Sequence, residues 1–134
     1  MDAKAKFSDF TQTNRELSSA ARVAVNEVLD VRNGERVLII TNPEMNVYTI
    51  AMAVYDAIIE SKGVPVLCTQ PYKTQLDFAE PSMVKAIESN PDIAISLSAE
   101  KLGKDGTAMA NPYKIGEKTY DSAFNYLMAE KKMR

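Results

Sequence analysis

Apolar residues recur at helical spacing in three stretches of the chain. The first stretch predicts a helix over residues 14–30 with one buried stripe. The second stretch ends at Ser61-Lys62-Gly63, where Gly63 suits a left-handed C-terminal cap. The third begins near Pro81 and ends at Asn90-Pro91-Asp92. The three predicted apolar faces contain, in order, Leu17, Ala20, Ala21, Ala24, Val25 and Val28; Val47, Ile50, Ala51, Val54 and Ile58; and Met83, Val84 and Ile87.

Short apolar runs separate these helices and predict strands at residues 37–40, 64–68 and 93–97. The runs are continuous rather than alternating, which is typical of strands covered on both faces of a sheet. Pro65 cannot donate a backbone hydrogen bond, so it belongs at a strand start or at a sheet edge. A fourth helix is predicted over residues 117–131, burying Tyr120, Phe124, Leu127 and Met128.

Strands that alternate with helices indicate parallel βαβ units with right-handed crossovers. We therefore expect one α/β domain over residues 1–134, a three-layer Rossmann-like or flavodoxin-like parallel sheet with flanking helices. The connection from Ser98 to Gly116 is long, polar and contains glycine. Its length far exceeds the usual loop of about 4 to 6 residues, so we expect it to be functional or mobile.

Composition excludes several classes of function. The chain has 134 residues, 46% of them apolar, with a single cysteine and no histidine. An intramolecular disulfide is therefore impossible, and the commonest general base and zinc ligand are missing. The net charge of −2 is spread along the chain, which argues against a nucleic-acid partner. No apolar run resembles a signal peptide or a membrane span, so we expect no membrane partner and a cytoplasmic location.

Sequence motifs for phosphate chemistry are also missing. Neither a GxGxxG loop nor a P-loop occurs, and the link from Thr41 to Asn46 contains no glycine. A phospho-receiver domain would need aspartates where this chain has Glu44 and Glu100. Cys68 ends an apolar strand with no histidine to activate it, so we interpret it as part of the core. We interpret the charges of the long connection, Lys101, Lys104 and Asp105 among them, as a solvated surface.

Ligands of open α/β sheets bind beyond the carboxyl ends of the strands, where the winding reverses. The polar residues expected around such a crevice include Thr41 and Tyr72, and we name as candidate ligand-binding residues Asn42, Gln70, Ser98 and Glu100. Every α/β sheet has such an edge, so this argument predicts a location and not a chemistry.

One stretch resembles a known family. A helix that leads into the strand GERVLI, a second helix after a short polar link, and the strand entry KGVPV resemble the N-terminal domain of the aminopeptidase T family of metallopeptidases. This family includes the thermophilic leucyl aminopeptidases. The resemblance covers residues 17–97. It implies an α/β domain that helps to shape the cleft and the dimer, while the C-terminal domain of the family holds two divalent metals.

None of the family's metal ligands can be placed on this chain, which implies that the chain is inactive alone and holds no cofactor itself. The first hypothesis is therefore a non-catalytic N-terminal domain whose partner is a second copy, in a homodimer, or a missing C-terminal domain. The second is a stand-alone flavodoxin-like module that binds a small ligand at the strand ends. The third is an enzyme that uses the connection from Ser98 to Gly116.

Overall fold

A computed structural model describes residues 5–74, 76–99, 103, 105, 108–109, 113–115, 117–120, 122–131 and 133. A short 3-10 turn at Phe7–Asp9 precedes the regular elements. The helices and strands are α1 (Arg15–Val23), β1 (Arg36–Thr41), α2 (Met45–Glu60), β2 (Val64–Thr69), α3 (Pro81–Glu88), β3 (Ile93–Leu97), β4 (Tyr113–Ile115), β5 (Lys118–Tyr120) and α5 (Ala123–Glu130).

The fold is mixed α/β, as predicted, with a parallel 3-stranded sheet in the order β2-β1-β3. Val37 lies opposite Pro65 on one side of β1 and opposite Ile93 on the other. The central strand β1 is buried from Val37 to Thr41. A strand covered on both faces explains why its sequence reads as a continuous apolar run.

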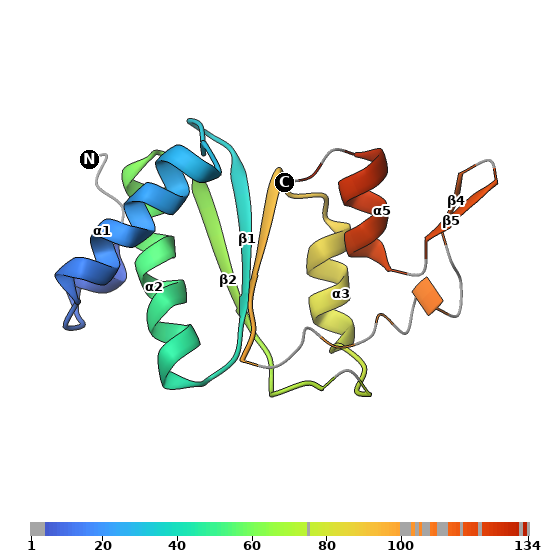
Figure 1. Cartoon of the computed structure of the whole chain (residues 1–134), viewed down its shortest axis with the longest axis horizontal. Coiled ribbons are helices and arrows are strands. Elements are labelled where there is room, and N and C mark those ends of the chain that lie inside the picture. The colour runs from blue at the N-terminus through green and yellow to red at the C-terminus, as the bar shows by residue number, and fades with distance from the viewer. Residues whose placement is uncertain are drawn as a thin grey trace.

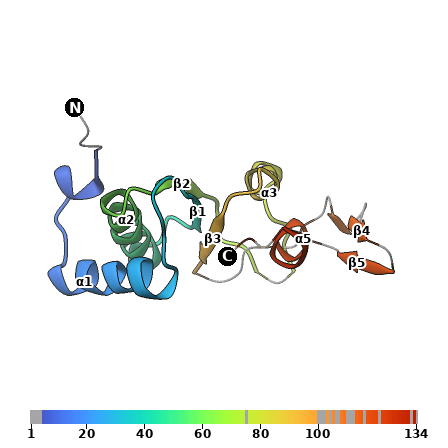
Figure 2. The ribbon, with the colours of Figure 1, turned by 90° about the horizontal axis from the view of Figure 1, so that it is seen from above.

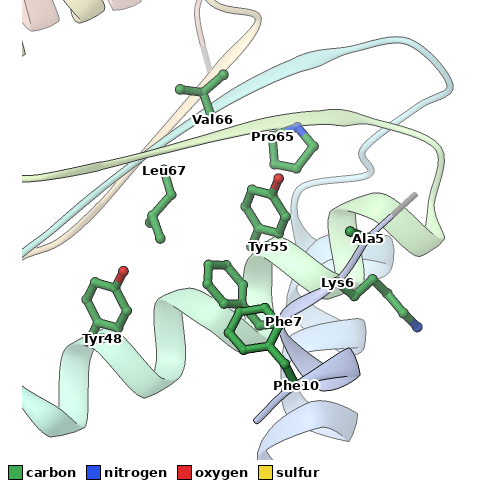
Figure 3. Close-up of a pocket in the computed structure, with 9 residues that line it drawn as sticks. All are labelled: Ala5, Lys6, Phe7, Phe10, Tyr48, Tyr55, Pro65, Val66 and Leu67. Carbon is green, nitrogen blue, oxygen red and sulfur yellow. The ribbon is translucent and has the colours of Figure 1, made fainter.

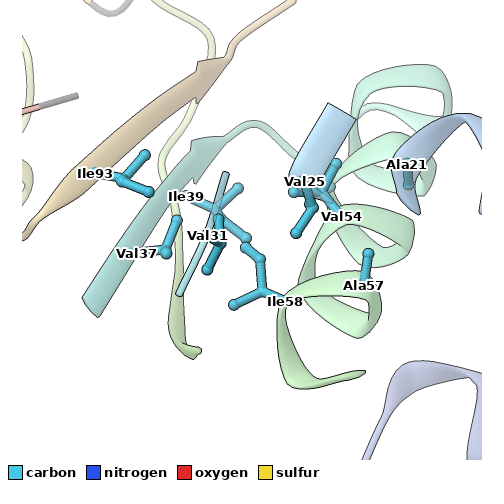
Figure 4. Packing of buried hydrophobic residues seen from close by; sticks show 10 residues of the cluster. Ala21, Val25, Val31, Val37, Ile39, Val54, Ala57, Ile58 and Ile93 are labelled. Carbon is cyan, nitrogen blue, oxygen red and sulfur yellow. The ribbon is translucent and has the colours of Figure 1, made fainter. Parts of the chain in front are cut away.

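Helices cover both faces of this sheet. Figures 1 and 2 show α1 and α2 on one side of the sheet and α3 and α5 on the other. One apolar cluster joins the sheet to α1 and α2, through Ala21, Ile39 and Ile58 (Figure 4). A second cluster joins the opposite face, through Ile40, Met83 and Leu127. The crossover from β1 to β2 therefore runs over one face and the crossover from β2 to β3 over the other, so the winding reverses between β1 and β3.

The first predicted helix changes its hydrogen-bonding pattern part-way along. α1 continues as a π-helical segment over Ala24–Val28, in which the Leu29 amide donates to the Ala24 carbonyl at 2.9 Å. The wider turn rotates the following side chains. Leu29 packs against the core, and Val28 is 76% exposed. The expectation that Val28 and Ala20 lie on the buried stripe was therefore wrong, whereas Ala21 and Val25 are buried as expected.

The turn after α2 also differs from the expectation. Lys62, with φ of 64°, takes the left-handed conformation that the sequence suggested for Gly63. Glycine is required at position 63 for a steric reason instead, because a Cβ atom there would lie 2.8 Å from side-chain carbons of both Ile58 and Val31. Gly34 does take a left-handed conformation, with φ of 83°, in the turn that enters β1.

The C-terminal part was predicted least well. Residues 117–131, predicted as one helix, contain the strand β5 and the shorter helix α5 instead. Tyr120 of β5 pairs with Tyr113 of β4 in an antiparallel hairpin. β4 itself lies within the connection expected from Ser98 to Gly116. Leu127 is buried as predicted, but Met128 is 49% exposed, and the side chain of Phe124 lies outside the described residues.

Candidate functional site

The predicted crevice at the strand ends is filled by its own polar side chains. Asn42, which follows β1, is fully buried. Its amide nitrogen donates to the Gln70 carbonyl at 2.9 Å and to the Pro71 carbonyl at 3.3 Å. Its amide oxygen accepts the Ala99 N–H at 2.7 Å. One side chain thus connects the segments that follow all the strands of the sheet.

Gln70 and Thr41 complete this cluster. Gln70 is 2% exposed, and its side-chain oxygen accepts the Glu80 N–H at 3.1 Å, which ties the end of β2 to the start of α3. The Thr41 hydroxyl donates to the Leu97 carbonyl at 3.0 Å. Buried polar groups that are fully hydrogen-bonded hold a structure in one arrangement. Asn42, Gln70 and Thr41 therefore position the strand ends.

The structure brings Asn42, Gln70 and the segment Ser98–Ala99 together, as the topology argument predicts. Ser98 is half-buried, and its hydroxyl lies 3.2 Å from that of Ser96. Glu100, the fourth candidate, lies outside the described residues. Ligand contact at these residues stays a prediction.

A hollow of about 380 Å³ adjoins this cluster on the α3 side of the sheet. Cys68, Gln70 and Glu80 are among its lining residues. Glu80 pairs with Lys73 at 2.9 Å. Burial raises the pKa of the Cys68 thiol, which keeps it protonated at neutral pH and makes it a poor nucleophile. Cys68 also packs against the second core cluster, in agreement with its interpretation as a core residue.

A second concave feature lies between α2 and β2, and the sequence analysis missed it. This apolar groove has a volume of about 540 Å³ and is lined by Ala5, Lys6, Phe7, Phe10, Tyr48, Tyr55, Pro65, Val66 and Leu67. Figure 3 shows Tyr48 and Tyr55 extending from α2 toward β2, with Phe7 and Phe10 beside Tyr55. The sequence did contain a pattern that could have indicated this groove, because Tyr48 and Tyr55 are two helical turns apart on one face of α2.

Asp56 of α2 holds in place the N-terminal segment that lines this groove. The Asp56 carboxylate accepts the N–H of Phe7 at 2.7 Å and that of Ser8 at 2.9 Å. The Phe7 ring then meets the Tyr55 ring edge to face, with centroids 5.1 Å apart. Asp56 is only 9% exposed, so these bonds are shielded from water. The N-terminal segment is therefore anchored on α2, and Phe10 is left 75% exposed at the groove rim.

The described residues contain no group of three or more His, Cys, Asp or Glu side chains placed to hold a metal ion. Within the same part of the chain, no helix combines the length and the apolar character needed to cross a bilayer.

Comparison of the chain with protein-family models, with curated proteins and with solved structures gives no significant match.

Proposed function

We propose that this chain is a non-catalytic α/β domain that works through contacts with other protein surfaces. The observation that carries the proposal is the apolar groove of about 540 Å³ beside β2, with the exposed residues Phe10 and Val66 at its rim. Aromatic groups beside a concave apolar surface are typical of protein interfaces. The polar groups at the strand ends, in contrast, are engaged with one another through Asn42.

The resemblance described above suggests the setting for such contacts. In this proposal the chain is a three-layer, Rossmann-like or flavodoxin-like N-terminal domain of an aminopeptidase T-like metallopeptidase. Its partners are a second copy of the chain or a C-terminal domain that carries two divalent metals. The present chain shapes the cleft and the subunit contact and supplies no metal ligand.

The test of this role is an activity assay on the purified chain. We expect no release of leucine from leucyl substrates above a metal-only control, with or without added zinc or cobalt, because the groups that would activate water belong to another domain. Calorimetric titration should show no tight stoichiometric zinc uptake. Turnover by the chain alone would show that it is an enzyme and not a contact domain.

One observation favours a second candidate, a flavodoxin-like module that binds a small ligand. The winding reverses between β1 and β3, and a hollow of about 380 Å³ lies at the same edge of the sheet, at the end of β2 beside Gln70. A ligand identified by screening should then perturb the amide signals of Asn42, Ser98 and Glu100. Perturbation confined to Asn33-Gly34 or Asn90-Pro91, at the opposite strand ends, would exclude this site.

A further inference from the structure

The outer edge of β2 presents a defined set of backbone groups. β2 pairs with β1 on one side only, and no strand of the described residues pairs with its other side. The Val64 N–H donates to the Glu35 carbonyl at 2.8 Å, and the Gln70 N–H donates to the Thr41 carbonyl at 3.1 Å. Backbone groups alternate in direction along a strand, so the even-numbered residues of β2 face β1. The odd-numbered residues of β2 face outward.

The outward residues are Pro65, Leu67 and Thr69. Pro65 has no N–H, and an outward position is where a proline leaves the ladder of the sheet intact. The edge therefore offers the N–H groups of Leu67 and Thr69 as donors, and the carbonyl groups of Pro65, Leu67 and Thr69 as acceptors. An antiparallel copy supplies a carbonyl acceptor for both N–H donors of each edge, and the missing N–H of Pro65 leaves one carbonyl of each edge without a donor in the ladder.

Apolar surface lies on both faces of this edge. The groove with Phe7 and Tyr55 lies on the α2 side. On the α3 side a smaller hollow of about 100 Å³ is lined by residues that include Leu38 and Ala86. Val66 is 54% exposed between them, and Figure 3 shows its side chain on the opposite side of the strand from Leu67. A strand added here needs apolar side chains on both faces, as β2 itself has.

Charge does not oppose the meeting of two such edges. Edge strands are commonly protected from pairing by charged residues, but β2 carries none from Val64 to Thr69. Of the charged side chains near its two ends, Lys6 pairs with Glu60 at 3.1 Å and Lys73 with Glu80 at 2.9 Å, while the exposed Lys62 forms no ion pair within the described residues. An antiparallel arrangement brings the start of one β2 next to the end of the other, which keeps the Lys62 residues of the two copies apart.

We propose that β2 pairs antiparallel with β2 of a second copy, so that the two sheets become continuous across a two-fold axis perpendicular to them. This inference rests on the proposed contact function and assigns its surface and partner. With the axis at Leu67, the Leu67 N–H of each copy donates to the Leu67 carbonyl of the other copy. The Thr69 N–H then donates to the partner copy's Pro65 carbonyl. When the axis lies at Cys68 instead, the backbone groups of Leu67 in one copy bond to those of Thr69 in the other. Both registers use every donor of the edge and bury Val66.

The test combines light scattering with amide hydrogen exchange over a concentration series up to about 1 mM. We expect the mass to rise from one chain to two. The Leu67 and Thr69 amides, which pair with no strand of the described residues, should become protected together with that rise. The Val66 amide, which faces β1, should be protected throughout. The variant Val66→Lys should weaken the dimer about tenfold or more, by loss of apolar contact and by charge repulsion near the axis.

Ser96→Lys is the matched control, because Ser96 is exposed on β3, the other edge strand of the sheet. It should dimerise like the parent chain, and at concentrations where the parent is a single chain both variants should keep the parent's melting temperature. Two results would overturn the assigned surface while the contact function stands. One is a dimer that forms without protection of the Leu67 and Thr69 amides, and the other is a dimer that Val66→Lys leaves intact. A single-chain mass at all concentrations overturns the inference itself. Failure of the contact function is seen separately, as turnover in the peptidase assay.

Discussion

The side-chain amide of Asn42 donates to the Gln70 carbonyl at 2.9 Å, across 28 positions of sequence, with Asn42 fully buried. The same side chain accepts the Ala99 N–H at 2.7 Å. Asn42 is thus a structural connection between the ends of β1, β2 and β3, at the position where a ligand of an open α/β sheet would otherwise lie.

Asn42→Ala should therefore destabilise the fold. The substitution leaves the Ala99 N–H without its partner, and each unsatisfied buried polar group costs about 1–3 kcal/mol. We expect urea denaturation to show a loss of about 2–4 kcal/mol in the free energy of unfolding. Asn46→Ala is the control, since Asn46 is exposed in the first turn of α2, and it should change stability by less than about 0.5 kcal/mol. Equal effects of the two variants would contradict the structural role of Asn42.

The turn after α2 yields a pair of opposite predictions. Lys62→Gly should stabilise the chain by up to about 1 kcal/mol, because glycine adopts a φ of 64° without steric strain. Gly63→Ala should destabilise it by about 1–3 kcal/mol, because the new methyl group would crowd Ile58 and Val31 in the core. Thermal unfolding of both variants measures the two signs, and a stabilising Gly63→Ala would show that the turn has another conformation.

Asp56 should hold the N-terminal segment against α2. Asp56→Asn removes the carboxylate that accepts both the Phe7 and the Ser8 N–H groups. Hydrogen bonds to charged groups contribute about 1.5–3 kcal/mol, so the segment should detach and chymotrypsin should cleave after Phe7 and Phe10 faster than in the parent chain. Asp30→Asn, at a side chain that is 61% exposed, should leave the cleavage rate unchanged. Unchanged cleavage in Asp56→Asn would mean that other contacts hold the segment.

Glu60 should make stability depend on pH at the acid side. Its hydrogen bond with Arg22 at 2.9 Å, together with Lys6, lowers the pKa of the Glu60 carboxyl. A lowered folded-state pKa contributes stability that is complete above the ordinary glutamate value of about 4.3 and is lost as pH falls through the folded value. Glu60→Gln should therefore melt below the parent chain at pH 7, with the difference shrinking below about pH 4.

The matched control for that measurement is Glu27→Gln, at an exposed residue of the π-helical segment. Its melting temperature should follow that of the parent chain at every pH. A constant difference between Glu60→Gln and the parent from pH 7 to about pH 3 would show that packing, and not the charge of Glu60, stabilises this corner.

The elements around the sheet could be predicted from the sequence, because local periodicity depends on which residues must be buried. The run of residues 93–97 is a strand with the predicted bounds, and Met83, Val84 and Ile87 are the buried residues of α3. Parallel pairing and the edge position of Pro65 followed from the alternation of strands with helices and from the missing N–H of proline.

Only the tertiary structure decided what depends on side chains meeting across the sequence. The π-helical turn that moves Leu29 inward and Val28 outward has no periodic signal, since the change of hydrogen bonding follows from packing against the core. The groove needs Phe7, Tyr55 and Leu67, which three separate elements bring together. The strand-end residues that the sequence placed at one edge do lie together. Their hydrogen bonds, however, join groups far apart in the chain. The fold alone therefore decided whether these residues form an open site or a closed polar cluster.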